Sequence, residues 1–379
     1  MKIVIAPDSF KECLTAAQVA QAIETGLKQV IPDAECIKVP VADGGEGTLQ
    51  SLVDATNGRL IELPVTGPMG GIVQASFGLL GDGETAVIEM ARASGIELVP
   101  ADQRNPMIST TRGTGELILS ALDHGIKRMI VGIGGSATND GGAGMMQVLG
   151  VKLLDVDGEE LPCGGAALSK LCNIDTSQMD ERLKSVEFIA ACDVDNPLTG
   201  ANGASAVFGP QKGASPEMVE QLDQALKHYA NLLKRDLGKE VEQEPGAGAA
   251  GGMGAALLAF LGAELKPGID IVMEAVDLAG KVIGADLLIT GEGRIDGQTA
   301  QGKTPVGAAR IAKQLDLPVI ALAGSVGSGV EAVYERGIDA LFPIVHGAVP
   351  LSEALANGEK NLIRAARNLA STLMLFNTL

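Results

Sequence analysis

KIVIAPDSFKECLTAAQVAQAIETGLKQV, residues 2–30, contains the first strand, loop and helix that the sequence predicts. The apolar run Lys2–Ala6 predicts a buried strand, and the polar loop Pro7–Cys13 follows it. Thr15 has the character of a helix N-cap, and Ala16–Val30 has the apolar spacing of an amphipathic helix. This order of strand, loop and helix predicts an α/β layer built on a largely parallel sheet.

The same order recurs along the chain, with an interruption in which three short runs predict an antiparallel meander: Leu60–Val65, Ile72–Leu79 and Thr85–Met90. A further hairpin is predicted over Val151–Leu161. The remaining predicted strands are Cys36–Val41, Met129–Ile133, Val186–Cys192, Asp286–Thr290, Val319–Ala323 and Ala340–Ile344. The predicted helices are Leu49–Ala55, Glu116–His124, Pro216–Asp236, Ala255–Gly262, Gly329–Arg336 and a C-terminal helix from Leu351.

The length of 379 residues predicts two domains of ordinary size. The N-terminal βαβ unit is too small to bury a core alone, so we expect it to join the C-terminal α/β part. Residues 1–60 and 283–379 would then form one discontinuous α/β domain. Residues 61–282 would form an inserted α/β domain that carries the antiparallel hairpins.

Composition excludes several functional classes. A net charge of −18 repels nucleic acid and anionic membranes, and the acidity itself favours solubility. The N-terminus does not have the pattern of a signal peptide, and no apolar run predicts a membrane span. Five irregularly spaced cysteines and three histidines give no zinc pattern, and predict free thiols in a reducing cytoplasm. The sequence leaves a homo-oligomer open.

Glycine-rich loops follow two of the predicted apolar segments. The loop 134–144 leaves the strand Met129–Ile133 and leads into an apolar helix, and amides at a helix N-terminus favour anions. The alternative is a turn that only needs positive φ at several glycines. A second loop, 245–254, has the same composition. The candidate phosphate-binding residues of the two loops are Gly134, Gly135, Ser136, Thr138, Asn139, Gly248 and Gly251.

Residues 297–304, GQTAQGKT, match the Walker A pattern. A P-loop leaves its strand directly, whereas the predicted strand here ends near Thr290. Pro305, at the start of the following helix, also lacks an N–H. We therefore interpret Lys303 as an ordinary phosphate or substrate contact, outside a true P-loop.

Carboxylates follow several predicted strands, where open α/β sheets bind ligands. They are Asp43, Asp193, Asp195, Glu292 and Asp296. Such groups bind Mg²⁺ or accept a hydroxyl proton, although N-caps and Asx turns need the same residue types. Lysines in two further loops, Lys11 and Lys212, are candidate anion contacts or solvated loop residues.

Taken together, the loops resemble those of the bacterial glycerate kinase type 1 family, and the resemblance extends from end to end. One departure is Glu12, which stands where many members have glycine. The motifs that carry the resemblance are Pro7–Lys11, Ala42–Thr48, Arg112–Glu116, Gly134–Gly142, Asp193–Gly200, Phe208–Ala214, Pro245–Gly254 and Thr290–Asp296.

The resemblance implies ATP- and Mg²⁺-dependent phosphorylation of D-glycerate to 2-phosphoglycerate, within glycolate, glucarate or galactarate breakdown. It also implies two α/β domains, one of them flavodoxin-like and inserted into the other, with an active-site cleft between them. Formation of 3-phosphoglycerate by the same kinase is one alternative. A non-enzymatic sensor of a small phosphorylated acid is another.

The roles of individual residues are our own hypothesis. Asp193 and Asp195 would hold Mg²⁺, while Asp43 or Asp296 would accept the proton of the glycerate hydroxyl. Neutralisation of the glycerate carboxylate and the transferring group would fall to Lys11, Arg294 and Lys303, with Ser9 beside them. The predicted catalytic set is therefore Asp193, Asp43, Lys11 and Asp296.

Overall fold

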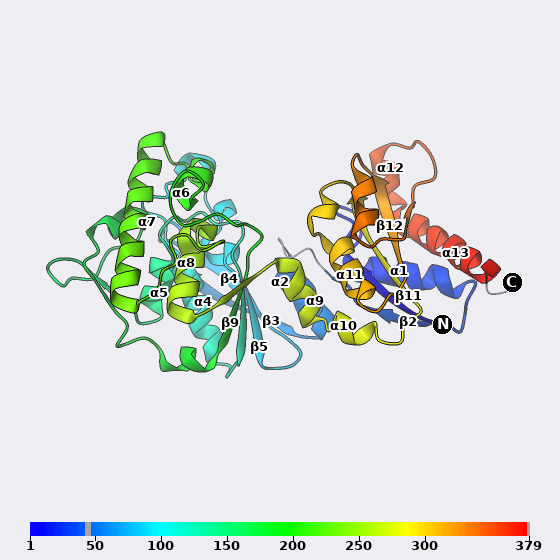
Figure 1. Cartoon of the computed structure of the whole chain (residues 1–379), viewed down its shortest axis with the longest axis horizontal. Helices are drawn as coiled ribbons and strands as arrows, with labels where there is room; N and C mark the ends of the chain where they lie inside the picture. Colours follow the sequence, from blue (N-terminus) through cyan, green and yellow to red (C-terminus); the bar gives the residue numbers. More distant parts are fainter. Residues whose placement is uncertain (42–46, 377–379) are drawn as a thin grey trace. The chain divides into compact units, whose positions relative to one another are not determined.

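The computed structural model describes residues 1–41 and 47–376. The chain divides into two compact units (Figure 1). Unit 1 contains Met1–Ala55 and Ile269–Leu379, and unit 2 contains Thr56–Gly268. The sequence of unit 2 is therefore inserted into that of unit 1. Asp43 lies outside the described residues.

Unit 1 is built on a five-stranded parallel sheet with the order β13-β12-β11-β1-β2. In chain order this is the 2-1-3-4-5 arrangement of flavodoxin-like sheets. The α/β class is confirmed, but the flavodoxin-like order belongs to the discontinuous unit and not to the inserted one. The strands are β1 (Lys2–Pro7), β2 (Glu35–Lys38), β11 (Leu287–Ile295), β12 (Val319–Val326) and β13 (Ala340–Pro343).

Helices cover this sheet, and α1 packs closely against α13. Thr15 caps α1 as predicted, because its side chain accepts a hydrogen bond from the Gln18 amide. The helices of unit 1 are α1 (Ala16–Lys28), α2 (Thr48–Thr56), α9 (Gly268–Ala275), α10 (Leu278–Lys281), α11 (Thr304–Lys313), α12 (Leu351–Ala356) and α13 (Gly358–Phe376), with 3₁₀ turns η6 (Thr299–Gln301) and η7 (Val330–Arg336).

Unit 2 has a six-stranded mixed sheet with the order β10-β9-β6-β5-β4-β3. The antiparallel meander β3-β4-β5 is confirmed, and β5, β6, β9 and β10 are parallel. The strands are β3 (Arg59–Thr66), β4 (Ile72–Leu79), β5 (Thr85–Glu89), β6 (Arg128–Gly132), β9 (Glu187–Ala191) and β10 (Glu264–Lys266).

The predicted hairpin over 151–161 is confirmed: Leu154 forms an antiparallel bridge with Glu160, the Leu161 amide donates to the Leu153 carbonyl and the Asp155 amide donates to the Glu159 carbonyl. The sequence did not predict that β7 (Lys152–Leu154) also pairs with β8 (Asn173–Asp175). A local pattern of turn residues could not indicate a partner that lies after a 3₁₀ segment, η3 (Gly165–Lys170).

The longest helix of unit 2 is α7, whose N-cap is Ser215 and whose C-cap is Gly238, a glycine with positive φ. In α8 the residues Ala250, Gly251 and Gly252 are not helical, so its regular part begins after them. The helices are α3 (Ala91–Ser94), α4 (Arg112–Leu122), α5 (Ala143–Val148), α6 (Ala204–Phe208), α7 (Pro216–Leu237) and α8 (Ala249–Leu261), with 3₁₀ turns η1 (Ile96–Leu98), η2 (Ala101–Gln103), η4 (Glu181–Ser185) and η5 (Pro210–Lys212).

Both cores consist mainly of aliphatic side chains and methionine, as the low aromatic content predicts. Across the described residues, none of the helices combines the length and apolarity needed to cross a membrane.

Replacement of Gly26 by alanine tests the packing of α1 on α13. A Cβ there would lie 2.2 Å from the carbonyl oxygen of Ile363 and 2.7 Å from the Cβ of Ala366. We expect a loss of about 2 kcal/mol, since overpacking outweighs the better helix propensity of alanine. Thermal unfolding measures it. Gly71→Ala is the control, because its Cβ would meet nothing within 4 Å; equal destabilisation of both variants would contradict the packing argument.

Candidate functional site

In unit 1, β1 and β11 pair in parallel at the centre of the sheet, so their carboxyl ends lie side by side. The Asp8 amide, just after β1, donates to the Gly291 carbonyl at 2.8 Å. The Asp8 Oδ2 accepts a hydrogen bond of 2.8 Å from the Thr304 hydroxyl at the start of α11. Strand order reverses at this point of a 2-1-3-4-5 sheet, and ligands of open α/β sheets bind at such points.

Glu292 projects from β11 and is only 7% exposed. Its carboxylate accepts a short hydrogen bond from the Thr299 hydroxyl. Burial raises the pKa of the Glu292 carboxyl from an ordinary 4.5 to about 7. The hydrogen bond from Thr299 and the charge of Lys303 lower this pKa, whereas the charges of Asp8 and Asp296 raise it further. A carboxyl with this pKa both accepts and returns a proton near neutral pH.

The other predicted residues of unit 1 that the structure describes lie at the end of β11 and in the loops that follow β1 and β11. Arg294 Nε is 3.0 Å from Asp296 Oδ2, so the two charges partly neutralise each other. Ser9 donates its amide to the Asp8 carboxylate at 2.6 Å, and Lys11 is exposed in the same loop. The structure thus brings Ser9, Arg294, Asp296 and Lys303 into the loops at the carboxyl ends of β1 and β11, together with Lys11.

The prediction that the strand before residues 297–304 ends near Thr290 is wrong, because β11 continues to Ile295. The Walker A pattern therefore follows its strand almost directly. The amides of Gln301, Gly302 and Lys303 nevertheless donate to the carbonyls of Gln298 and Thr299. Because these amides are used within the turn, they do not form the anion cradle of a P-loop. Lys303 is partly buried at the N-cap of α11.

In unit 2, the loop 134–144 follows β6 and is exposed at Gly134 and Gly135 but buried from Ser136 to Asp140. Asp140 accepts hydrogen bonds from the amides of Gly142 and Gly144 and from both the amide and the hydroxyl of Thr111. The Met145 amide donates to the Thr111 hydroxyl. The amides of Gly142, Gly144 and Met145 thus already have hydrogen-bond partners within the protein.

Lys212, weighed above as an anion contact, is a buried residue with 2% exposure. Its Nζ donates to Ser136 Oγ and to the Thr138 carbonyl, both at 2.7 Å. Burial lowers the pKa of the Lys212 ammonium to about 7, opposed by the charge of Asp140. In this position the Lys212 Nζ contacts the loop 134–144.

Gly248 and Gly251 are buried, and their lack of a side chain has a packing reason. A Cβ on Gly248 would lie 2.2 Å from the Pro197 carbonyl, and one on Gly251 would lie 2.0 Å from that of Thr138. The Gly141 amide also donates to the Gly251 carbonyl at 2.9 Å. The loop 245–254 therefore supports the loop 134–144 through direct backbone contact.

Asp193 and Asp195 follow β9 and are exposed. The Asp193 Oδ1 accepts a hydrogen bond of 2.9 Å from the Gly268 amide, which fixes its carboxylate. Within residues 1–41 and 47–376, no three His, Cys, Asp or Glu side chains are arranged to hold a metal by themselves. Two carboxylates still suit Mg²⁺, because kinases coordinate this ion through one or two carboxylates together with the substrate phosphates.

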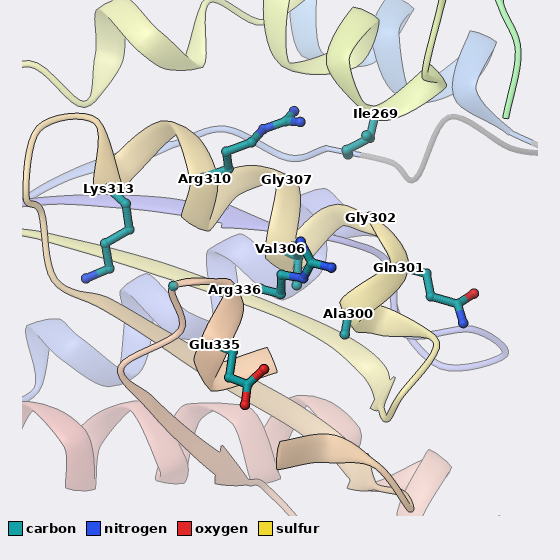
Figure 2. A pocket seen from close by; sticks show the side chains of 11 residues that line it. Ile269, Ala300, Gln301, Gly302, Val306, Gly307, Arg310, Lys313, Glu335 and Arg336 are labelled. Atoms are coloured by element: carbon teal, nitrogen blue, oxygen red, sulfur yellow. The ribbon is translucent and has the colours of Figure 1, made fainter. Parts of the chain in front are cut away.

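A pocket of about 540 Å³ borders the turn 299–302 of unit 1. Figure 2 shows that the side chains of Arg310 and Lys313 point away from each other. Arg310 pairs with Asp270, and Lys313 Nζ lies 2.6 Å from Asp339 Oδ2. Because these cations do not converge, we assign the pocket no ligand. Its lining is Ile269, Ala300, Gln301, Gly302, Val306, Gly307, Arg310, Lys313, Glu335, Arg336 and Gly337.

Sequence reasoning missed Asp8, Thr299 and Asp140. Asp8 directly follows β1, just as Asp193 follows β9, so the rule that selected Asp193 could have found it. The link from Thr299 to Glu292 and the burial of Asp140 depend on tertiary contacts, for which the sequence carries no signal.

Loops rich in carboxylates, hydroxyls and lysines at the carboxyl ends of parallel strands are typical of α/β enzymes. A family model described as "Glycerate kinase family" matches residues 3–374, and the chain belongs to this family.

Individual relatives agree with this assignment. The chain is 60% identical over 379 residues to the glycerate kinase of Bacillus subtilis (strain 168), covering 100% of this chain and 99% of the relative. It is 56% identical to the glycerate 2-kinase of Escherichia coli (strain K12), covering 98% of each. A crystal structure from Salmonella typhimurium LT2, provisionally named glycerate kinase 2, matches with a TM-score of 0.92 and 54% identity over 100% of both chains.

Replacement of Glu292 by glutamine tests the environment of the buried carboxyl. The folded-state pKa of about 7 lies above the ordinary 4.5. The contribution of the protonated Glu292 carboxyl to the free energy of unfolding is therefore complete below pH 4.5 and is lost as the pH rises through 7. We expect the variant to equal the wild type in stability near pH 4.5. At pH 8.5 it should be more stable by on the order of 3 kcal/mol, from a shift from 4.5 to about 7 at about 1.4 kcal/mol per pH unit.

Urea unfolding at the two pH values measures this difference. The control is Glu335→Gln, which changes an exposed glutamate of the same unit. A Glu292→Gln difference that does not depend on pH would contradict the assigned environment.

Proposed function

We propose that this chain transfers the γ-phosphoryl group of ATP to the 2-hydroxyl of D-glycerate, giving 2-phospho-D-glycerate and ADP. The observation that carries the proposal is the match to the glycerate kinase family over residues 3–374. The relative named glycerate 2-kinase, at 56% identity over nearly the whole chain, favours the 2-position over the 3-position. The free cysteines of the described chain fit a reducing cytoplasm.

In unit 1 we assign glycerate to the loops that follow β1 and β11. The cations Lys11, Arg294 and Lys303, with Ser9 beside them, would neutralise the substrate carboxylate and the transferring group. Asp296 is engaged in an ion pair with Arg294 at 3.0 Å. Glu292, with a pKa near 7, is better suited to take the hydroxyl proton.

In unit 2 we assign the ATP phosphates to the exposed turn of the loop 134–144. Gly134 and Gly135 are its exposed residues, and a Cβ on Gly134 would meet nothing within 4 Å, so a phosphate has room to approach the backbone. Ser136, Thr138 and Asn139 are buried and would shape this turn.

Magnesium would be held by Asp193 and Asp195 together with phosphate oxygens, and when bound it would neutralise charge on the phosphates. The fixed orientation of Asp193, through the Gly268 amide, would limit the motion of that ligand. In the transfer, the 2-oxygen of glycerate forms a bond to the γ-phosphorus while the bond to the bridging oxygen of ADP breaks. The hydroxyl proton passes to the Glu292 carboxylate.

The product decides the proposed reaction. Purified protein with ATP, Mg²⁺ and D-glycerate should yield a ³¹P NMR signal with the coupling of a phosphate on a secondary carbon, at the 2-position. A signal from a primary phosphate ester would identify a 3-kinase. Absence of any D-glycerate-dependent ADP release would instead favour a non-enzymatic sensor.

Asp193→Asn tests the magnesium assignment. The amide keeps an oxygen for the Gly268 N–H but loses the charge, so we expect kcat to fall about 100-fold or more and the Mg²⁺ requirement to rise. Steady-state kinetics across Mg²⁺ concentrations measure both. Asp157→Asn, in an exposed turn of the same unit, is the matched control. Near-normal turnover of Asp193→Asn would remove Asp193 from the catalytic set.

A further inference from the structure

Lys212 is held in place by its own short segment. It is the last residue of η5 and precedes Gly213, which has a φ of +91°. A Cβ on Gly213 would lie 2.4 Å from the Arg104 carbonyl, and Arg104 Nη1 donates to the Gln211 carbonyl at 3.3 Å. These contacts fix the backbone from which the Lys212 side chain enters the interior of unit 2.

The ammonium ends on the loop 134–144. It donates to the Ser136 hydroxyl and to the Thr138 carbonyl, and so joins two residues of one turn from a segment that is distant in sequence. The same turn is bonded on its other side: the Ala137 amide donates to the Ser94 carbonyl, and the Ala137 carbonyl accepts from the Ser109 hydroxyl at 3.0 Å. Ser136 and Thr138 are therefore both tied to Lys212, and Ala137 between them is tied to Ser94 and Ser109.

Burial of this ammonium is costly for stability. Among the described residues, the two contacts of Lys212 Nζ are a hydroxyl and a carbonyl, and Asp140 is the charge that acts on it. A buried ammonium with incomplete pairing is usually less favourable than an apolar side chain of similar volume. Stability alone does not account for a lysine here, so its role concerns the conformation that it imposes on the loop.

We propose that Lys212 is a positioning residue for ATP, which holds the turn 136–138 so that Gly134 and Gly135 present their backbone to the phosphates in one conformation. The inference rests on the proposed function of this loop. Because Lys212 is only 2% exposed and its Nζ already donates to two loop acceptors, the proposed role works through the loop and needs no direct contact with a phosphate.

Lys212→Met removes the donors while keeping a long apolar side chain. We expect KM for ATP to rise at least 10-fold, with KM for D-glycerate changed less than 2-fold and kcat less than 3-fold. Binding of a non-hydrolysable ATP analogue, measured by calorimetry, should weaken by the same factor. Equal changes in both KM values, or unchanged ATP affinity, would overturn the proposal.

Tyr229→Phe is the matched control. Tyr229 is as fully buried, its ring packs beside Gly141 of the same loop, and its hydroxyl has no protein partner. The control should leave KM for ATP within 2-fold of the wild type. A Tyr229→Phe effect as large as that of Lys212→Met would show a general sensitivity of the core and would overturn the specific role of the lysine.

A double-mutant cycle with Ser136→Ala separates positioning from a loss of folding. If Lys212 acts through Ser136, the change in ATP affinity caused by Ser136→Ala should be smaller in the Lys212→Met background than in the wild type. Additive effects would overturn the proposal. If Lys212→Met does not fold, Lys212→Gln, which removes the charge but retains an NH₂ donor group, replaces it in the cycle. Wild-type turnover of D-glycerate tests the proposed function separately, because calorimetric ATP binding needs no turnover.

Discussion

The parallel pairing of β1 with β11 is the contact on which unit 1 depends. It joins residues from the two ends of the chain, with Ile3 opposite Leu287 and Ile5 opposite Ile289, all of them buried. Neither end buries enough apolar surface to fold alone, so the pairing completes one sheet. It also sets the chemistry, because parallel strands end at the same edge. Asp8 after β1 and Glu292 within β11 thereby come to share one polar environment.

A second constraint acts inside unit 2, where buried polar groups must find partners in the protein. The amides that begin α5 are satisfied by Asp140 and Thr111, and Ser136 is bonded to Lys212. Two buried polar atoms of this loop, Thr138 Oγ1 and Asn139 Oδ1, have no hydrogen-bond partner in the protein. The interior of this loop is thus a polar network, and only Gly134 and Gly135 stay open to solvent. Rigid support behind a small exposed surface is the arrangement that a phosphate-binding turn needs.

The two units treat charge in different ways. In unit 1 the cations Arg294 and Lys303 stand close to carboxylates, and burial brings the pKa of Glu292 to about 7, where proton transfer is efficient. In unit 2 burial brings the pKa of a lysine, Lys212, to about the same value, yet its ammonium faces only the protein. A perturbed pKa is therefore consistent with a chemical role in one unit and with a positioning role in the other.

The sequence by itself determined the α/β class, most strands and helices, the antiparallel meander and the membership of a kinase family, because apolar periodicity, caps and loop motifs are local patterns. Only the tertiary structure decided that β11 extends to Ile295, that β7 pairs with β8, and that Gly248 and Gly251 serve packing. The sequence also left Lys212 as either an anion contact or a solvated loop residue, and could not link Thr299 to Glu292. The physical reason is that burial, hydrogen-bond partners and pKa depend on which distant segments surround a side chain, and no local pattern encodes that neighbourhood.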